Sequence, residues 1–486
     1  MTHDDESVDR SLAVLTRGIE AGSWPRPGEL KRTAQRRRRT KLGGLIAAGA
    51  AVATAVTVAV VVPRDVPRDA PRKAVRVAAD LVVSGRSGTA VQLAANAAPL
   101  TVADPSTASA VARAEQAFTL ALLKQTNKAG GHQNVVLSPS SLAIALAMLQ
   151  NGAAGSTREE ISAALGTSSM TAEQQDAGWA ALMSDLAKAG TDAGIDLQSA
   201  NSLWLQHKLP LGADFMAAMA RYFRTGVWQV DFQRDLTGAE RAINAWCSAH
   251  TRGRITKLFG QGDLDDTTLL VLANAVYFKA AWQHPFDPKV TAPAPFYRSD
   301  GSTSTPQFMS TEKGPANLAA VSTPGYDAVQ LPYQGGRFAA LVVMPKGQDL
   351  APFVNGLTAD RLHQISTSLR EQPASLRMPR FGAQTYTRLD DTLKAMGMPR
   401  AFTGSADFSR LSPVPMKVQS VVQRDVLRVG EQGTEAAAAT GISMKYVSGT
   451  TIRGLQLTID HPFLFLVRDT RTGAVLFAAQ VQDPTG

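Results

Sequence analysis

The run of residues 269–282, LLVLANAVYFKAAW, constrains the fold of this chain more than any other stretch. It is apolar almost throughout and is rich in β-branched and aromatic side chains. Such a run is typical of a central strand that is covered on both faces. Helix-like patterns lie mostly before it, and strand-like segments such as residues 326–333 and 337–346 follow it. The order of helices early and strands late predicts an α+β domain.

The segment around residues 134–161 predicts a buried helix. Ser138 and Pro139 mark its start, because Ser is favoured at the N-cap and Pro is tolerated in the first turn. Leu142, Leu146 and Leu149 then recur at helical spacing and form an apolar face. A second helix is predicted over residues 110–125, and a strand over residues 196–211.

The stretch 431–448, EQGTEAAAATGISMKYVS, has an ambiguous pattern. From Thr434 onward, alternate residues are small to apolar, with small to polar residues between them, which is the period of a half-buried strand. The stretch also contains two Gly and four consecutive Ala, which are poor strand formers. It is interpreted either as a loop that can enter a sheet or as an Ala-rich surface loop or short helix.

Several motifs in the same order resemble the serpin family over residues 110–484. The first is the helix start at Ser138, and the last is the carboxy-terminal hairpin with His461-Pro462-Phe463. Between them stand INAWCSAHTRGRI (243–255), NAVYFKAAW (274–282) and the hinge EQGTEAAA (431–438). The resemblance implies an α+β serpin fold with three β-sheets, eight to nine helices and an exposed reactive-centre loop. We expect a bacterial member of the family.

The resemblance also implies a suicide-type inhibitor of serine or cysteine endopeptidases. The protease would attack one loop bond, and the cleaved loop would insert into the central sheet before the acyl-enzyme could be hydrolysed. Residues at the loop hinge are small or flexible, as insertion requires; they are Glu431, Gly433, Thr434, Glu435, Ala436, Ala437, Ala438, Ala439 and Thr440. The alternative is a non-inhibitory serpin that acts as a cell-surface binding or carrier module.

Counting from the hinge by the family pattern places the reactive bond at Val447-Ser448. A small aliphatic residue there suits an elastase-like target. A bond at Tyr446-Val447 would suit chymotrypsin- or subtilisin-like enzymes, and one at Lys445-Tyr446 would suit trypsin-like enzymes. The register stays open among these three.

Opening of the central sheet depends, in the family, on a polar cluster beneath its strands. Matching positions here are Ser138, Ser141 and Asn274, and Gln423 replaces the histidine of many relatives. Glutamine both donates and accepts hydrogen bonds but does not titrate like imidazole. Trp282 matches the aromatic residue where insertion begins, and ordinary core packing is the competing interpretation for it.

The amino-terminal region predicts a membrane anchor. Residues 1–41 form a short basic segment, and residues 42–62 are 21 residues without a charge. As a helix this run would reach about 31 Å, which matches the hydrocarbon core of a bilayer. Residues 63–107 are interpreted as a linker, in which Val-rich patches at 81–92 have the pattern of short strands. Residues 108–486 are interpreted as the serpin domain.

Positive charge decides the expected orientation of this anchor. Seven Lys and Arg precede the apolar run closely and five follow it, which favours the amino end inside. A single-pass protein of the cell membrane with an extracellular serpin domain is therefore expected. A cleaved signal peptide is the competing interpretation, but the polar lead is long for one.

Other classes of function have little support. Residues 1–80 hold 15 Lys and Arg against 9 Asp and Glu, so most of the net charge of +9 belongs to the amino-terminal region and does not indicate a nucleic-acid-binding domain. The single cysteine, Cys247, is predicted to be a packed thiol. No hydrolase motif or metal-ligand spacing is present, so we expect no enzyme, no cofactor and no metal, and a monomer.

Overall fold

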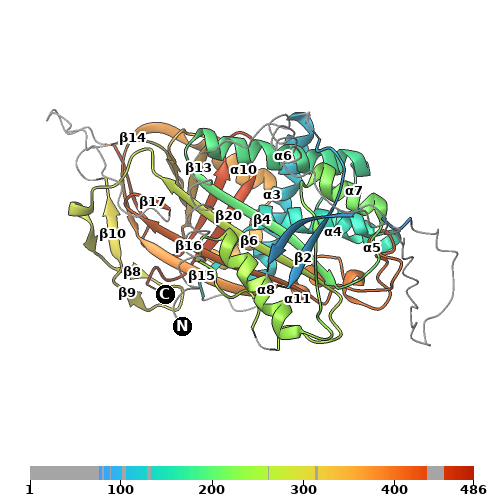
Figure 1. Cartoon of the computed structure of the whole chain (residues 1–486). Helices are drawn as coiled ribbons and strands as arrows, with labels where there is room; N and C mark the ends of the chain where they lie inside the picture. Colours follow the sequence, from blue (N-terminus) through green and yellow to red (C-terminus); the bar gives the residue numbers. More distant parts are fainter. Residues whose placement is uncertain are drawn as a thin grey trace, which may run out of the picture. The chain divides into compact units, whose positions relative to one another are not determined.

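The computed structural model describes residues 76–78, 81–87, 89–100, 105–128, 133–260, 262–311, 316–434 and 454–485. All of them lie in one compact unit, Pro71–Gly486. The described part contains three sheets and nine α-helices, which confirms the predicted α+β class (Figure 1).

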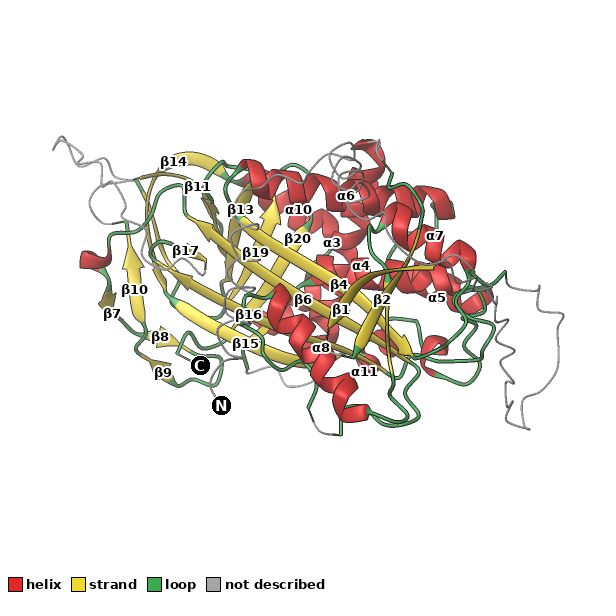
Figure 2. Cartoon of the chain, viewed as in Figure 1, coloured by secondary structure: helices red, strands yellow, loops and turns green. Residues whose placement is uncertain are grey.

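The first sheet, called sheet I, has eight strands and runs diagonally through the molecule (Figure 2). In spatial order they are β1 (Leu81–Ser87), β2 (Ala90–Ala95), β5 (Val227–Val230), β4 (Asp196–Gln206), β6 (Leu270–Ala281), β17 (Gly433–Thr434), β16 (Ser420–Gly430) and β15 (Phe381–Arg388). Strand β6 is the run predicted from its apolar sequence to be central. It pairs with β4 on one side and with β16 and β17 on the other, so its central position is confirmed.

Both faces of β6 are covered. Leu270, Leu272 and Phe278 join the main hydrophobic core, while Val271 and Ala273 join a second core beneath helix α8 (Leu236–His250). The alternation explains why this strand reads as a continuous apolar run, because each face of it packs against a different layer.

The second sheet, sheet II, has ten strands and packs against the other side of the main core. Its members are β3 (Val135–Leu137), β20 (Val475–Val481), β19 (Phe463–Asp469), β13 (Phe338–Pro345), β12 (Tyr326–Pro332), β11 (Ala316–Ser322), β14 (Arg370–Pro379), β10 (Gln307–Ser310), β7 (Ala292–Pro293) and β18 (Leu455–Thr458). Strands β8 (Phe296–Tyr297) and β9 (Thr303–Ser304) form the small third sheet.

The remaining helices gather mostly at one end of the molecule (Figure 2). They are α3 (Pro105–Lys128), α4 (Pro139–Gly152), α5 (Gly155–Ala164), α6 (Ala172–Asp192), α7 (Ala213–Tyr222), α9 (Leu350–Gly356), α10 (Ala359–Ser368) and α11 (Asp390–Ala395). Short 3-10 turns occur at Pro288–Val290 and Arg400–Phe402.

Helix α4 is buried along its whole length and starts at Pro139, as the sequence predicts. The predicted serine cap is wrong in detail, because the Ser138 side chain accepts no bond from the helix. Its hydroxyl instead donates to the carbonyl oxygen of Leu476 at 2.8 Å, and so ties the start of α4 to β20 of sheet II.

Strands β1 and β2 form an antiparallel hairpin within the range interpreted as a linker, and β2 pairs with β5 at the edge of sheet I. The expected membrane helix at 42–62 and the segment 1–41 lie outside the described residues. None of the described helices is both long and apolar enough to cross a membrane.

Candidate functional site

The candidate site is the boundary between β6 and β16, which we call the seam. At its upper end the two strands are separated by β17, which pairs with both of them: Thr434 lies opposite Ala280 of β6 and opposite Val429 of β16. Further along, at Gln423 and Asn274, β6 and β16 pair directly with each other in parallel. The sheet is therefore parted at one end of the seam and closed at the other.

Gly433 is required at the parted end because of a close approach. Its backbone has φ +145°, and a Cβ there would lie 2.0 Å from the carbonyl oxygen of Ala280. No L-residue with a side chain tolerates both conditions. The sequence interpretation, that Gly433 supplies backbone freedom, thus has a steric reason as well.

Thr434 is fully buried at the entrance to the seam. Its hydroxyl lies 2.6 Å from the hydroxyl of Tyr333, and Tyr333 stacks on Trp282 with ring centroids 4.4 Å apart. Burial raises the pKa of the Tyr333 hydroxyl, so this group stays neutral and is able to donate. Trp282 also donates its indole N–H to the Gly430 carbonyl at 2.9 Å, so it holds the end of β16 as well as packing in the core.

Glu431 fixes the turn that precedes β17. Its carboxylate accepts a hydrogen bond from the Thr291 hydroxyl at 2.9 Å and lies 3.8 Å from a guanidinium nitrogen of Arg380. The Glu431 carbonyl accepts from the Phe286 amide, also at 2.9 Å. The turn is therefore anchored from three sides, and the chain leaves it in a defined direction.

A polar cluster lies beneath the closed end of the seam. Gln423 Nε2 donates to the Ser138 carbonyl at 2.9 Å and to Asn274 Oδ1 at 3.2 Å. Asn274 Nδ2 in turn donates to the Ser141 hydroxyl at 2.5 Å. Of the five residues that the sequence assigned to sheet opening, the structure thus brings four together, while Trp282 lies at the parted end of the seam. Ser138 contributes its backbone carbonyl to the cluster, because its hydroxyl donates to the Leu476 carbonyl of β20.

Asn201 of β4 is a fifth member that the sequence reading missed. Its Oδ1 accepts hydrogen bonds from Asn274 Nδ2 and from the Ser141 hydroxyl. Asn201 lies directly opposite Asn274 in the β4–β6 register. Only that register signals its role, since one polar residue in a strand is not distinctive by itself.

Asp425 is a second residue that sequence reasoning missed. It lies two positions along β16 from Gln423, on the same inner face, and is 1% exposed. Neither carboxyl oxygen has a hydrogen-bond partner, and Gln423 Oε1 also lacks one. Burial raises the pKa of Asp425 well above its ordinary value. The signal that the sequence offers for Asp425 is a charged residue two positions from Gln423, which puts both side chains on the same face of the strand.

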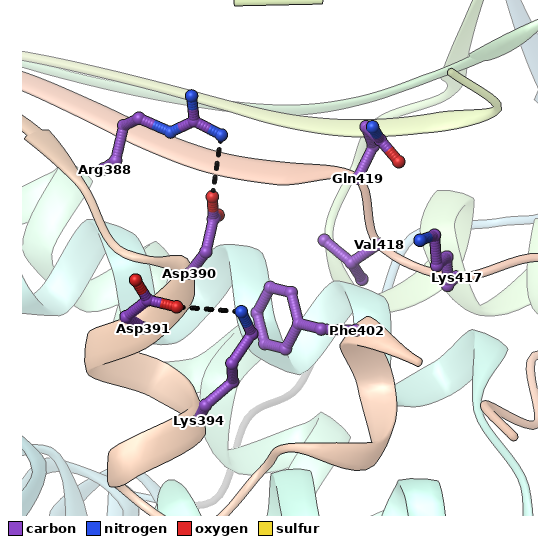
Figure 3. A pocket seen from close by; sticks show the side chains of 8 residues that line it. All are labelled: Arg388, Asp390, Asp391, Lys394, Phe402, Lys417, Val418 and Gln419. Atoms are coloured by element: carbon purple, nitrogen blue, oxygen red, sulfur yellow. Dashed lines mark hydrogen bonds and ion pairs between the residues drawn. The ribbon is translucent and has the colours of Figure 1, made fainter. Parts of the chain in front are cut away.

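The lower end of the seam opens onto a pocket of about 370 Å³ (Figure 3). Arg388 at the end of β15 pairs with Asp390 at 3.1 Å, and the other Asp390 oxygen accepts from the Val421 amide of β16 at 2.6 Å. Lys394 pairs with Asp391 at 2.8 Å and lies over the Phe402 ring. The four charged side chains of Arg388, Asp390, Asp391 and Lys394 are thus paired with one another within the pocket.

The other sequence-predicted residues of the loop lie outside the described residues. These are Glu435, Ala436, Ala437, Ala438, Ala439, Thr440, Val447 and Ser448. Cys247 is buried in the core beneath α8, which confirms the packed thiol, and burial raises its pKa to about 12. In the described part of the chain, no three His, Cys, Asp or Glu side chains are grouped so as to hold a metal ion.

Comparison with known proteins agrees with this geometry. Residues 113–484 match the family model described as serpin (serine protease inhibitor). The chain is 34% identical to Serpin-Z1C of Triticum aestivum over 384 residues, which covers 76% of this chain and 94% of that protein. It is also 34% identical to plasminogen activator inhibitor 1 of Sus scrofa, covering 77% of this chain and 93% of the relative.

Among solved structures, human thyroxine-binding globulin aligns with a TM-score of 0.70 at 26% identity, covering 78% of this chain and all of that one. The fold and the seam define a class of protein in which the central sheet, sheet I, is opened at one end by the short strand β17. The chain belongs to the serpin family, and the resemblance noted in the sequence is confirmed. Similar proteins come from plants, mammals and archaea, so the bacterial source stays a prediction.

Proposed function

We propose that this chain inhibits serine or cysteine endopeptidases by inserting its cleaved reactive-centre loop into the seam of sheet I. One observation carries the proposal: Gly433 and Thr434 already occupy the upper end of the seam as β17. Many members of the family are protease inhibitors, and plasminogen activator inhibitor 1 is named as one. The chain itself would act as a trap and not as an enzyme.

Extending the register of β17 predicts what each following residue would meet. Ala436 would lie between Leu427 and Phe278, and Ala438 between Asp425 and Val276. Small side chains suit both positions, since the flanking residues are already packed in the core. A charge at Ala436 would be buried between two apolar side chains without a partner, which costs several kcal/mol.

Thr440 would arrive between Gln423 and Asn274 in the same register. Its hydroxyl would reach the polar cluster, where Gln423 Oε1 has no hydrogen-bond partner. A donor there would satisfy a buried acceptor, which contributes about 1 kcal/mol or more. Insertion would therefore separate the direct β6–β16 pairs at Gln423 and Asn274 and replace them with a threonine that suits the cluster.

For the reactive bond we retain Val447-Ser448, with an elastase-like protease as the first target to test and chymotrypsin-, subtilisin- and trypsin-like enzymes beside it. We also propose that residues 42–62 anchor the chain in the cell membrane with the serpin domain outside. Proteolysis of intact cells would test this: external protease should release the domain, and its survival inside sealed cells would contradict the orientation.

The full-length chain should be mixed with elastase, subtilisin, chymotrypsin and trypsin and assayed for an SDS-stable covalent complex. Mass spectrometry of the released carboxy-terminal peptide would locate the bond, and a peptide starting at Ser448 is expected. Cleavage by all four without trapping, and without a gain in thermal stability, would reject the inhibitor and leave the carrier function.

Two adjacent alanines provide a matched pair of variants. In Ala436→Arg the arginine would face the core on insertion, whereas in Ala437→Arg it would face outward. Both residues lie beyond β17, so neither substitution alters the described contacts of the hinge. We expect Ala436→Arg to be cleaved without trapping and Ala437→Arg to keep trapping. Equal behaviour of the two variants would contradict the insertion register.

A further inference from the structure

A second pocket, remote from the hinge, lies where the amino-terminal hairpin meets the body of the protein. Its volume is about 240 Å³, and it lies between β2, β4 and β5, helices α4 and α6, and the end of α8. Six of its lining residues matter here: Gln92, Asn201, Arg224, Trp228, Trp246 and His250. Gln92 precedes the stretch 113–484 that matches the family model, so the chain's own amino-terminal segment supplies one wall.

The hairpin is docked on the body by specific contacts. Ala90 is fully buried in the core beneath α8, and Ser87 donates to the Ala242 carbonyl of that helix at 3.1 Å. A Cβ at Gly226 would lie 2.2 Å from the Leu93 carbonyl oxygen. Such a close approach requires glycine, so the sequence of the body is adapted to the presence of β2. These contacts hold the hairpin in place, and with it Gln92 in the wall of the pocket.

Aromatic and apolar side chains form part of the wall of this pocket, beside the polar Asn201 and Thr225. Trp228 and Trp246 are each about nine-tenths buried or more, and both contact Trp204: one ring stacks on it at 5.0 Å and the other meets it edge-on at 6.0 Å. Such a cluster holds the two indoles in fixed orientations. Buried Met148 and Phe223 complete the apolar lining. A flat or narrow apolar group suits these walls.

The rim of the pocket is polar and carries positive charge. Arg224 is exposed and donates one guanidinium N–H to the Leu100 carbonyl at 3.4 Å. Its backbone adopts φ +52°, a left-handed conformation that is uncommon for a residue with a side chain. His250 is exposed at the end of α8, bonds the Trp246 carbonyl through Nδ1 at 2.7 Å and packs its ring against the Trp246 ring, with centroids 4.6 Å apart. Of the described residues that line the pocket, none is Asp or Glu. The charge of the rim thus complements an anion.

We infer that this pocket binds a small amphipathic carboxylate, with its apolar body against Trp228 and Trp246 and its carboxylate at Arg224. The volume lies just below the range of about 300 to 1,000 Å³ that holds drug-sized ligands, so the ligand is a single ring or a short chain. Arginine pairs with a carboxylate through two parallel N–H donors, which fixes the orientation of the ligand. Binding at this pocket does not require loop insertion, so it is independent of the proposed function.

The test uses 4-phenylbutyrate as the probe and its uncharged amide, 4-phenylbutyramide, as the matched ligand. Isothermal titration of the full-length chain should show one saturable site for the carboxylate and weaker binding of the amide. Fluorescence of Trp228 and Trp246 should change with the same midpoint. No saturable binding of the carboxylate up to about 1 mM overturns the inference.

Protein variants locate the site. Arg224→Asn removes the guanidinium but keeps a residue that tolerates the left-handed backbone, and it should weaken carboxylate binding by about tenfold, as loss of a charged hydrogen bond does. Arg221→Asn changes an arginine three residues away that does not line the pocket, and it should bind like the parent protein. Should Arg224→Asn fail to fold by circular dichroism, His250→Ala on the exposed end of α8 provides the second variant. Carboxylate binding that is unchanged in the folded pocket variants would place the ligand elsewhere and overturn the inference.

Discussion

Glu115 makes the stability of this serpin depend on pH in a direction opposite to that of most surface carboxylates. It is fully buried in α3, where Oε1 accepts from the Thr119 hydroxyl and Oε2 from the Val475 amide, each at 2.9 Å. Desolvation outweighs these hydrogen bonds and raises the pKa of Glu115 from 4.5 to about 7. The native state therefore holds this proton more tightly than the unfolded chain does.

The magnitude follows from linkage between protonation and folding. A rise in pKa from 4.5 to about 7 corresponds to about 3 kcal/mol, at about 1.4 kcal/mol per pH unit. Since the pKa of the folded state is raised, this stability is fully present below pH 4.5 and is lost as the pH rises through about 7. Glu115→Gln removes the titration. Its amide oxygen accepts from Val475, and its amide nitrogen donates to the Thr119 hydroxyl.

Urea unfolding, followed by tryptophan fluorescence between pH 4.5 and pH 8.5, would measure the effect. The free energy of unfolding of Glu115→Gln, relative to the parent protein, should rise by about 3 kcal/mol across this range. Glu159→Gln, at an exposed position of α5, serves as the control and should change little. A difference between Glu115→Gln and the parent protein that stays constant with pH would refute the reasoning.

Three further predictions concern other buried groups. Asp425→Asn should reduce the loss of stability between pH 4.5 and pH 8 in the same unfolding assay, because burial raises the pKa of Asp425; an unchanged pH profile would contradict this. Cys247, with its pKa raised to about 12, should react with Ellman's reagent only after unfolding in urea, and rapid reaction of the native protein would be inconsistent with its burial. Gly226→Ala should displace β2 and destabilise the protein by about 1–3 kcal/mol, with increased proteolysis at residues 81–95. Gly356→Ala, where a Cβ meets nothing within 4 Å, is the control, and equal melting temperatures for the two variants would argue against close docking of the hairpin.

The sequence predicts those parts of the fold in which local pattern and environment agree. The run of residues 269–282 is apolar on both sides because two different cores cover β6, so its central position was readable. Gly433 and Thr434 were readable as a hinge only through the family resemblance. Pattern alone left that stretch open between a loop that can enter a sheet and an Ala-rich surface loop or short helix.

What the sequence did not reveal depends on contacts between distant segments. Asn201 joins the cluster through the register of β4 against β6, and nothing in its own neighbourhood signals that pairing. The hairpin at residues 81–95 has the pattern of short strands, but its place beside β5 depends on Gly226 and the buried Ala90. Asp425 has both apolar and polar neighbours in the sequence, which do not show that its side chain points into the core. Burial there is what raises its pKa.

The engagement of β17 also bears on kinetics. Ordered structure usually grows from a nucleus that is unfavourable to form, after which each added residue contributes bonds. Here the first two residues of a new strand, Gly433 and Thr434, already pair with both neighbours. If the loop inserts as proposed, this initiating step would already be complete before a protease arrives. On the proposed mechanism only elongation remains, and its speed along the seam is matched against the time the enzyme needs to release itself.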